Sequence, residues 1–276
     1  MNSKSTPKPA RIVAIANQKG GVGKTTTCVN LAAAFARMKY SVLLIDFDPQ
    51  GNATTGSGID PRRLHMSACE LLLGERTAEE VILRPEDMEF DLLPANGDLT
   101  AAEISLLQMK RREFALKDAL QPLLDKYDWI FIDCPPSLNM LTLNALGAAN
   151  SVLIPMQCEY YALEGLTGLL NTVEQLRASI NPGLEIEGLL RTMYDGRNNL
   201  AQAVSDQLME NFGDRVYRTL IPRNIRVAEA PSYGQPVLLY DPRSKGAIAH
   251  VALAGEMLRR HEKRHIAQDK AKLTKP

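Results

Sequence analysis

The sequence lacks the features that mark secreted, membrane-spanning and zinc-binding proteins. Its first ten residues, MNSKSTPKPA, contain no apolar h-region and do not form a signal peptide. No run approaches the ~20 apolar residues of a spanning helix. The four cysteines are Cys28, Cys69, Cys134 and Cys158, and no two have the CxxC spacing of a zinc knuckle or a paired redox motif. We therefore expect a cytoplasmic protein with reduced thiols.

The chain also lacks an excess of charge of either sign. Its 276 residues include 32 Lys and Arg and 32 Asp and Glu. It is not a global polycation, so any contact with nucleic acid must come from local basic patches. No Asn-Lys-x-Asp motif occurs, which argues against specificity for GTP. There is no internal repeat and no linker, and a hydrophobic content of 45% supports a substantial core.

A glycine-rich loop lies between a predicted strand and a predicted helix near the N-terminus. The apolar run Ile12–Ala16 has the length of a strand buried on both faces, and Thr25–Lys39 is an Ala-rich helical pattern. Glycines let the backbone N–H groups of the loop turn inward, and the helix start adds unpaired N–H groups and the positive end of its dipole. The pattern therefore predicts a phosphate site. Its residues are Lys19, Gly20, Gly21, Val22, Gly23, Lys24, Thr25 and Thr26.

Two side chains of this loop have defined roles in nucleotide chemistry. Lys24 is placed to reach the β- and γ-phosphates of ATP, and the Thr25 hydroxyl is placed to ligate Mg²⁺. The strict phosphate-loop pattern would need a glycine at position 18, where Gln18 stands. An additional lysine, Lys19, opens the loop instead. The structural alternative is a glycine turn with two solvated lysines, and the flanking strand and helix argue against it.

Acidic residues end two further predicted strands. Asp46 and Asp48 close the strand Ser41–Phe47, and Asp133 closes Asp128–Asp133. Ligands of open α/β sheets gather at the carboxyl ends of the strands, so these carboxylates should lie beside the phosphate loop. Asp133 would hold Mg²⁺ through its waters, and a carboxylate at Asp48 suits the positioning on which phosphoryl transfer depends. Asp46 either caps a turn or orients the loop. The expected magnesium-site residues are Thr25, Asp48 and Asp133.

These motifs resemble those of the ParA/MinD family of ATPases. The loop with its early lysine is similar to the family's deviant Walker A motif, DFDPQGNAT (46–54) to its second motif, and IDCPPS (132–137) to its third. The resemblance implies ATP and Mg²⁺ as cofactors. It also implies a homodimer that forms with ATP, in which Lys19 crosses the interface to the partner's nucleotide, and a water positioned by Asp48. The implied catalytic residues are Lys19, Lys24 and Asp48.

The segment Gln157–Gly165, QCEYYALEG, is similar to the chromosomal ParA/Soj branch, and the resemblance extends from about Arg11 to Arg260. It implies a nucleoid-associated partitioning ATPase for a chromosome or a plasmid. The ATP-bound dimer would bind double-stranded DNA without sequence preference, and a ParB-type partner would release it by stimulating slow hydrolysis. Only ten residues precede the first predicted strand, so we expect no helix-turn-helix extension and no sequence-specific operator binding.

Two more groups of residues take roles from the resemblance. Pro222, Arg223 and Asn224 would lie near the adenine, and Arg197 and Arg226 would bind DNA. Both arginines are expected in turns that follow strand ends. If the arginines of this region share a face they form a phosphate-binding patch, and scattered surface arginines are the alternative. These arginines are Arg191, Arg197, Arg215, Arg218, Arg223 and Arg226.

Alternating buried strands and helices predict one doubly wound α/β domain with a mostly parallel sheet and P-loop NTPase architecture. A strand is expected at Val216–Ile221. A helix is expected at Gly246–His265, with Ile248, Val251, Ala252 and Leu258 packed against the sheet. The expected boundaries are a flexible tail at 1–10, the P-loop ATPase domain at 11–264 and a basic, partly disordered tail at 265–276.

Three alternatives share the phosphate loop. A MinD-like membrane ATPase would need an amphipathic C-terminal helix, but the tail after His265 offers only Ile266 and Leu273 as large apolar residues. We therefore expect no membrane contact. A ligase of the dethiobiotin-synthetase kind would need a small-molecule pocket. A ParA-like ATPase that positions another cargo shares every motif found here.

Overall fold

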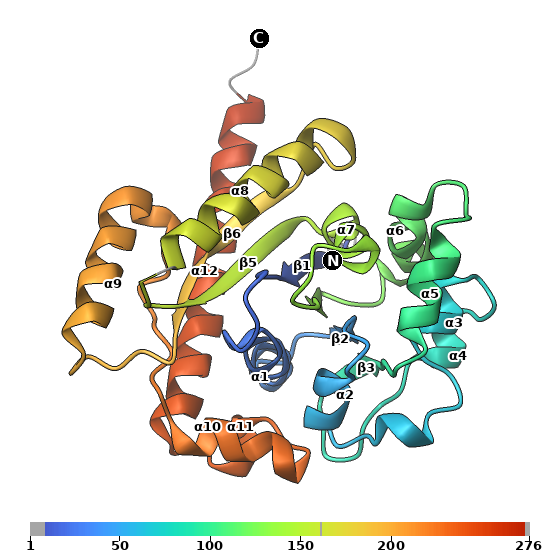
Figure 1. The fold of residues 1–276 in the computed structure, drawn as a ribbon, viewed down its shortest axis with the longest axis horizontal. Coiled ribbons are helices and arrows are strands. Elements are labelled where there is room, and N and C mark those ends of the chain that lie inside the picture. The colour runs from blue at the N-terminus through green and yellow to red at the C-terminus, as the bar shows by residue number, and fades with distance from the viewer. Residues whose placement is uncertain (1–8, 161, 274–276) are drawn as a thin grey trace, which may run out of the picture.

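Short apolar runs form a single parallel sheet in the computed structural model, which describes residues 9–160 and 162–273. The sheet has six strands in the order β3-β2-β4-β1-β5-β6 (Figure 1). All neighbouring strands pair in parallel. The chain therefore folds as the single doubly wound α/β domain that the sequence predicts. The strands are β1 Arg11–Ile15, β2 Val42–Asp46, β3 Asp91–Leu93, β4 Trp129–Asp133, β5 Ser151–Gln157 and β6 Glu185–Thr192.

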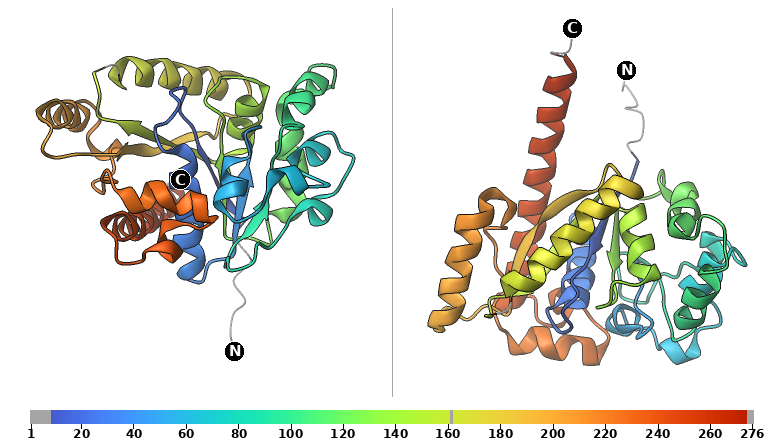
Figure 2. Two further views of the ribbon diagram at one scale, coloured as in Figure 1. Left: turned by 60° about the horizontal axis from the view of Figure 1, so that its bottom comes forward. Right: turned by 45° about the horizontal axis from the view of Figure 1, so that its top comes forward.

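Helices cover both faces of the sheet (Figure 2). The helices are α1 Lys24–Arg37, α2 Asn52–Gly56, α3 Ala68–Leu72, α4 Ala78–Val81, α5 Leu99–Leu106, α6 Ala115–Leu120, α7 Met140–Ala148, α8 Ala162–Ser179, α9 Asn199–Phe212, α10 Ile225–Glu229, α11 Val237–Tyr240 and α12 Lys245–Leu273. Short 3₁₀ turns are η1 Pro61–Arg63, η2 Arg112–Phe114, η3 Gln121–Leu123, η4 Gly213–Arg215 and η5 Ala230–Tyr233. No helix in these described ranges combines the length and apolar character needed to cross a membrane.

The alternation of side chains along β1 divides the core into two layers. Val13 and Ile15 pack with α1, α11 and α12, whereas Ile12 and Ala14 pack with α7, α8 and the helices that flank β3. Successive side chains of a strand point to opposite faces, so a strand between two helical layers must be apolar at every position. This explains why β1 is a continuous apolar run.

The segment Val216–Ile221 is not a strand, contrary to the sequence prediction. Only isolated bridges connect this region to its neighbours, at Val216 and just after the segment. Arg191 donates to the carbonyl oxygens of Tyr217 and Arg218 at 2.9 and 3.2 Å. Glu256 accepts from the N–H of Arg218 at 2.9 Å and from the next N–H at 2.8 Å. Tyr217 and Ile221 still donate to backbone carbonyl oxygens of β6, both at 2.9 Å, but side chains satisfy the backbone groups between them and interrupt the ladder.

Helix α12 differs from the prediction in its end and in its buried face. It continues past His265 to Leu273, because this stretch contains no glycine or proline to stop it. Ile248, Val251 and Ala252, expected in the core, are exposed, the first two by 59% and 40%, whereas His250 is fully buried. The prediction followed the apolar residues of the helix, but its inward face includes a histidine. Residues 1–8 and 274–276 of the two expected tails lie outside the described residues.

Candidate nucleotide site

The phosphate loop joins β1 to α1 at the carboxyl edge of the sheet. Gly21 and Gly23 have φ angles of +72° and +86°, a region in which other residues are strained. Gly23 is the N-cap of α1 and offers no side chain to the first turn, which also contains no acidic residue. The N–H groups of that turn are therefore open to an anion, as the sequence predicts.

Two adjoining cavities lie against this loop. The first has a volume of about 490 Å³ and is lined by the loop glycines, Lys24, Thr25 and Asp48. The second has a volume of about 180 Å³, and the expected adenine residues Pro222, Arg223 and Asn224 line it. Gly23, Thr26 and Met193 border both cavities. The structure thus brings the predicted phosphate and adenine residues to one continuous cleft.

The amino group of Lys24 lies in a partly desolvated, acidic environment. Its Nζ donates to the carbonyl oxygen of Lys19 at 3.2 Å. Burial lowers the pKa of Lys24, while the nearby Asp133 and Asp48 act in the opposite direction. A cation held in this way is suited to a phosphate group entering the cavity.

Asp133, at the end of β4, is the strongest indication of a cation site. Both of its carboxylate oxygens are buried without a hydrogen-bond partner among the described residues. Burial raises the pKa of Asp133 and the neighbouring Asp46 raises it further, while Lys24 and the Thr25 hydroxyl, which is nearby but makes no hydrogen bond of acceptable geometry, oppose the change. A buried carboxylate without a donor is costly, and a divalent cation would relieve that cost.

The described residues contain no group of three or more His, Cys, Asp and Glu that could hold a metal ion by itself. Mg²⁺ does not need such a group, because it is usually bound by one or two carboxylates together with phosphate oxygens and waters. Thr25 and Asp133 are the side chains that would hold it; Thr25 and Asp48 line the cavity, and Asp133 is fully buried beside Lys24.

Asp46 and Asp48 differ in their surroundings. Asp46 accepts from the N–H and the hydroxyl of Thr54, both at 2.7 Å, and Thr54 in turn accepts from the N–H of Ala95 at 2.9 Å. Burial raises the pKa of Asp46 to about 6, although the bonds from Thr54 act to lower it. Asp48 accepts from the N–H of Gln50 at 3.0 Å and lines the nucleotide cavity. Asp46 therefore organises the β2–α2 connection, and Asp48 faces the site.

The loop is fixed by contacts from β5 and β6. Thr192 of β6 donates to the carbonyl oxygen of Val22 at 2.8 Å, and Gln157 of β5 donates to the carbonyl oxygen of Gly21 at 3.3 Å. The side chain of Lys19 forms an ion pair with Glu159, from the β5–α8 connection, and both side chains are about half exposed. Lys19 thus sits at the rim of the site, bound to an acid of its own chain.

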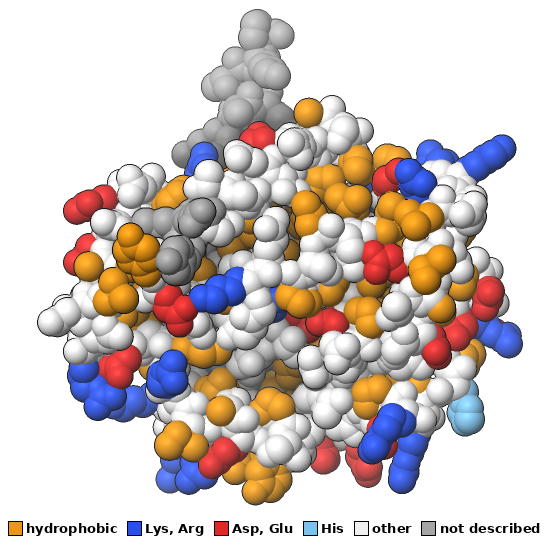
Figure 3. Space-filling view, in the orientation of Figure 1, with side chains coloured by type: hydrophobic (Ala, Val, Ile, Leu, Met, Phe, Trp, Pro, Cys, Tyr) orange, Lys and Arg blue, Asp and Glu red, His pale blue; other side chains and the backbone are white. Residues whose placement is uncertain are grey.

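Of the predicted DNA-binding arginines, Arg197 is exposed in the β6–α9 connection and pairs with Asp195 at 2.7 Å. Arg226 lies in α10 rather than in a turn, and it pairs with Glu229 at 2.9 Å. Arg191 is buried, so it cannot belong to a surface patch. The other arginines of the region are exposed, and basic side chains gather with acidic ones at the lower left of Figure 3, over α9 and α10. The exposed ones are Arg197, Arg215, Arg218, Arg223 and Arg226.

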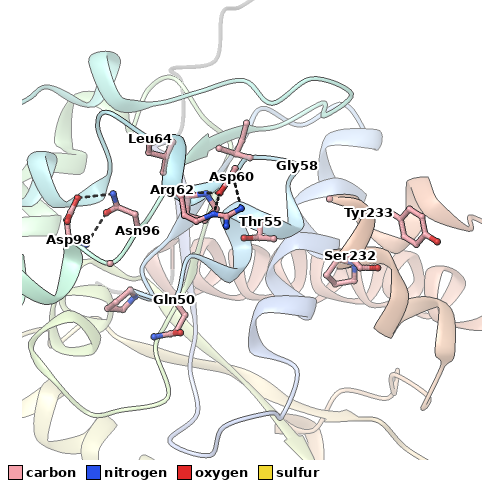
Figure 4. A pocket seen from close by; sticks show the side chains of 16 residues that line it. Gln50, Thr55, Gly58, Asp60, Arg62, Leu64, Asn96, Asp98, Ser232 and Tyr233 are labelled. Carbon is pink, nitrogen blue, oxygen red and sulfur yellow. Dashed lines mark hydrogen bonds and ion pairs between the residues drawn. The ribbon is translucent and has the colours of Figure 1, made fainter.

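A third and wider cavity of about 910 Å³ shares Gln50 and Thr55 with the nucleotide cavity (Figure 4). Its charged side chains are largely paired with one another. Arg62 binds Asp60 through two hydrogen bonds of 3.0 Å. Arg62 is 88% exposed, so this pair is a surface interaction of the cavity rim.

The structure also brings to the site two residues that sequence reasoning did not single out. His250 of α12 lines the smaller cavity, and Glu159 binds Lys19. No motif marks His250, since it lies within an ordinary helical pattern. Glu159 lies within the segment that resembles the ParA/Soj branch, but no spacing rule connects it to Lys19.

Comparisons with known proteins agree with this site. The family described as AAA domain matches residues 10–186. The chain is 49% identical over 258 residues to "Chromosome partitioning protein ParA" of Caulobacter vibrioides, covering 93% of this chain and 97% of that protein. It is 51% identical over 250 residues to "Chromosome-partitioning ATPase Soj" of Thermus thermophilus, covering 91% and 96%.

A solved structure also resembles the chain. The structure described as cobyrinic acid a,c-diamide synthase from Mycobacterium smegmatis, with bound ATP analog and magnesium, matches with a TM-score of 0.81 and 40% identity. The match covers 92% of this chain and 96% of that one. The family matches and the parallel sheet confirm what the motifs predict: the chain belongs to the ParA/Soj family of chromosome-partitioning P-loop ATPases.

Proposed function

We propose that this protein is a DNA-partitioning switch. Its ATP-bound dimer binds DNA without sequence preference, and a ParB-type partner releases it by stimulating a slow hydrolysis. One observation carries the ATPase core of the proposal: the charges of Asp48 and of the buried Asp133 act on Lys24 at an uncapped helix terminus. The curated relatives named for chromosome partitioning support the proposal that the cargo is DNA.

We assign the residues of the cleft separate roles in nucleotide binding and hydrolysis. The loop N–H groups and Lys24 would bind the phosphates, and Thr25 and Asp133 would hold Mg²⁺. Bound Mg²⁺ neutralises charge on the β- and γ-phosphates. Asp48, at the cavity wall, would orient the attacking water.

Dimer formation would require Lys19 to leave Glu159. Both partners of this ion pair are about half exposed, and such pairs contribute only about 0–1 kcal/mol. Lys19 can therefore give up its ion pair with Glu159 and bind the partner's phosphates instead at little cost in free energy. This supports a reversible assembly that depends on the nucleotide.

DNA binding would rest on exposed arginines, Arg197 and Arg226 first among them. Their present partners are surface carboxylates that DNA phosphates can replace. Because such contacts release counterions, binding should weaken steeply with salt. A difference in DNA affinity between the ATP and ADP states would make the protein a switch.

The test is binding to random-sequence duplex DNA with ATP, with ADP and without nucleotide, at several salt concentrations. We expect salt-sensitive binding only with ATP. Arg197→Ala should lower the slope of log K against log salt by about 1, the value for one lost phosphate contact. Absence of DNA binding in every nucleotide state contradicts the proposal.

Arg62→Ala is the matched control. Arg62 is 88% exposed and pairs with Asp60 two residues earlier, just as Arg197 is 91% exposed and pairs with Asp195. The two arginines thus differ in position but not in local geometry. An equal loss of slope in both variants would indicate a general charge effect and not a contact at Arg197.

A small-molecule ligase is the second candidate. The similarity to the M. smegmatis structure described as a cobyrinic acid a,c-diamide synthase and the wide cavity of about 910 Å³ favour it. The higher identity to the relatives named for chromosome partitioning counts against it. DNA would not change the behaviour of a ligase, so the same binding experiment separates the two functions.

A further inference from the structure

Arg226 is held more closely than the other proposed DNA-binding arginine. Its guanidinium pairs with Glu229 in the same helix at 2.9 Å and with Asp241, which follows α11, at 3.4 Å. Helices α10 and α11 lie next to each other at the bottom of Figure 1. The side chain of Arg226 is 53% exposed, whereas that of Arg197, which pairs with Asp195 of its own loop, is 91% exposed. Arg226 therefore lies between carboxylates from two elements.

These two carboxylates, Glu229 and Asp241, form what we call the acidic clamp. Glu229 accepts a hydrogen bond from the Tyr240 hydroxyl at 3.3 Å, and the Tyr240 ring stacks on that of Tyr233 with their centroids 4.8 Å apart. Tyr240 is the last residue of α11 and directly precedes Asp241. The tyrosine contacts thus connect the two halves of the clamp.

The segment that joins the two halves borders the nucleotide cavity. Residues 230–236 run from the end of α10 to the start of α11. Ala230, Pro231 and Gln235 of this segment line the cavity of about 490 Å³ that contains the phosphate loop. Val227 of α10 lines the smaller cavity. A shift of this segment at the phosphate end of the cleft would therefore change the separation of the two halves of the clamp.

We propose that the acidic clamp regulates DNA binding: Glu229 and Asp241 withhold Arg226 from DNA phosphates until ATP shifts the segment 230–236. Both acids are positioning residues, since they act through Arg226. Ion pairs between partly exposed side chains are weak, so a small change in position is sufficient to exchange them for phosphate contacts. The inference rests on the proposed function in one respect, that Arg226 contacts DNA.

The experiment is a double-mutant cycle on DNA affinity. The clamp variant, Glu229→Gln with Asp241→Asn, removes both charges at almost constant shape. Binding to random-sequence duplex DNA is measured with ATP and with ADP, from low salt upward, because low salt strengthens weak binding enough to measure it. With ADP, the clamp variant should bind about two- to tenfold more tightly than the wild-type protein. Its slope of log K against log salt should be steeper by about 1, the value for one gained phosphate contact.

With ATP the gain should be smaller, because the clamp is then already open. The ratio of the affinities with ATP and with ADP should therefore fall. In an Arg226→Ala background the two clamp substitutions should change neither this ratio nor the slope, because no arginine is left to release. A purely structural role of the two acids would not depend on Arg226 in this way.

The matched control is Asp206→Asn with Glu210→Gln. Both residues are exposed on α9, and neither forms an ion pair with another described residue. The control removes the same amount of negative charge near the other proposed DNA-binding arginine without releasing an arginine. It should change the affinities with ATP and with ADP by the same factor.

Two outcomes overturn the inference. One is a clamp variant with the wild-type ratio of affinities, and the other is an effect of the clamp substitutions that persists in the Arg226→Ala background. Asp241→Asn alone provides the same test if the double variant does not fold. If the wild-type protein binds no DNA in any nucleotide state, the proposed function fails and the clamp fails with it. If the wild-type protein binds DNA with ATP but the clamp variant keeps the ratio, only the clamp fails.

Discussion

Asp133 offers a prediction in which stability and function change in opposite directions. Both carboxylate oxygens of Asp133 are buried and unpaired, and Asp46 stands beside it as its register partner in the sheet. Asp133→Asn removes the charge at almost constant shape. Without Mg²⁺ and nucleotide, the variant should be more stable than the wild-type protein, because the buried charge is no longer uncompensated.

The magnitude follows from the environment of the carboxylate. Relief of one unsatisfied buried group is worth about 1–3 kcal/mol, which corresponds to a rise in Tm of about 2–10 °C for a domain of this size. The pKa of Asp133 is raised in the folded state. The folded state therefore binds more protons than the unfolded one, and the cost appears only above the unfolded pKa of about 3.9. The stability difference should be small near pH 4 and should grow as pH rises.

The assay is thermal unfolding with EDTA, with ATP alone and with ATP and Mg²⁺. Wild-type protein should gain additional stability from Mg²⁺ by mass action, and Asp133→Asn should lose that increment. Asp46→Asn is the matched control at the neighbouring strand end. Asp46 accepts three hydrogen bonds, two of them from Thr54, so this variant should lose about 1–3 kcal/mol. An Asp133→Asn protein that is no more stable without metal, or that keeps the Mg²⁺ increment, refutes the reasoning.

Three other substitutions test separate parts of the molecule. Asp48→Ala should retain ATP binding and lose hydrolysis, and normal phosphate release would remove Asp48 from the mechanism. Glu159→Gln should free Lys19 and lower the protein concentration needed for the ATP-dependent dimer by about two- to fivefold in sedimentation velocity; an unchanged midpoint means that the ion pair does not restrain Lys19. Arg264→Met removes a partner at 2.8 Å from the buried Glu187 and should cost about 1–3 kcal/mol in urea unfolding. Burial alone would raise the pKa of Glu187, but its arginine partners outweigh burial and lower it. The loss should therefore be present above the unfolded pKa of about 4.3 and disappear as pH falls through the folded pKa, so an equal loss at every pH would contradict this account.

Local patterns in the sequence determine the strands, the phosphate loop and the acids at the strand ends. The run Ile12–Ala16 must be apolar because it is covered on both faces, and Gly21 and Gly23 occupy backbone angles that other residues avoid. Asp48 and Asp133 could be placed near the loop because parallel strands end at one edge. These conclusions need only a residue's neighbours along the chain and the rules of open sheets.

The tertiary structure alone decides how distant side chains meet. Arg191 and Glu256 bind backbone groups in the middle of Val216–Ile221, so a segment with the pattern of a strand does not become one. The rotation of α12 about its axis buries His250 and exposes Ile248, and the close contact at Gly246 permits it. Such choices are made by competition among hydrogen bonds and packing contacts between remote segments. The order of residues along the chain does not show which of these competing contacts will form.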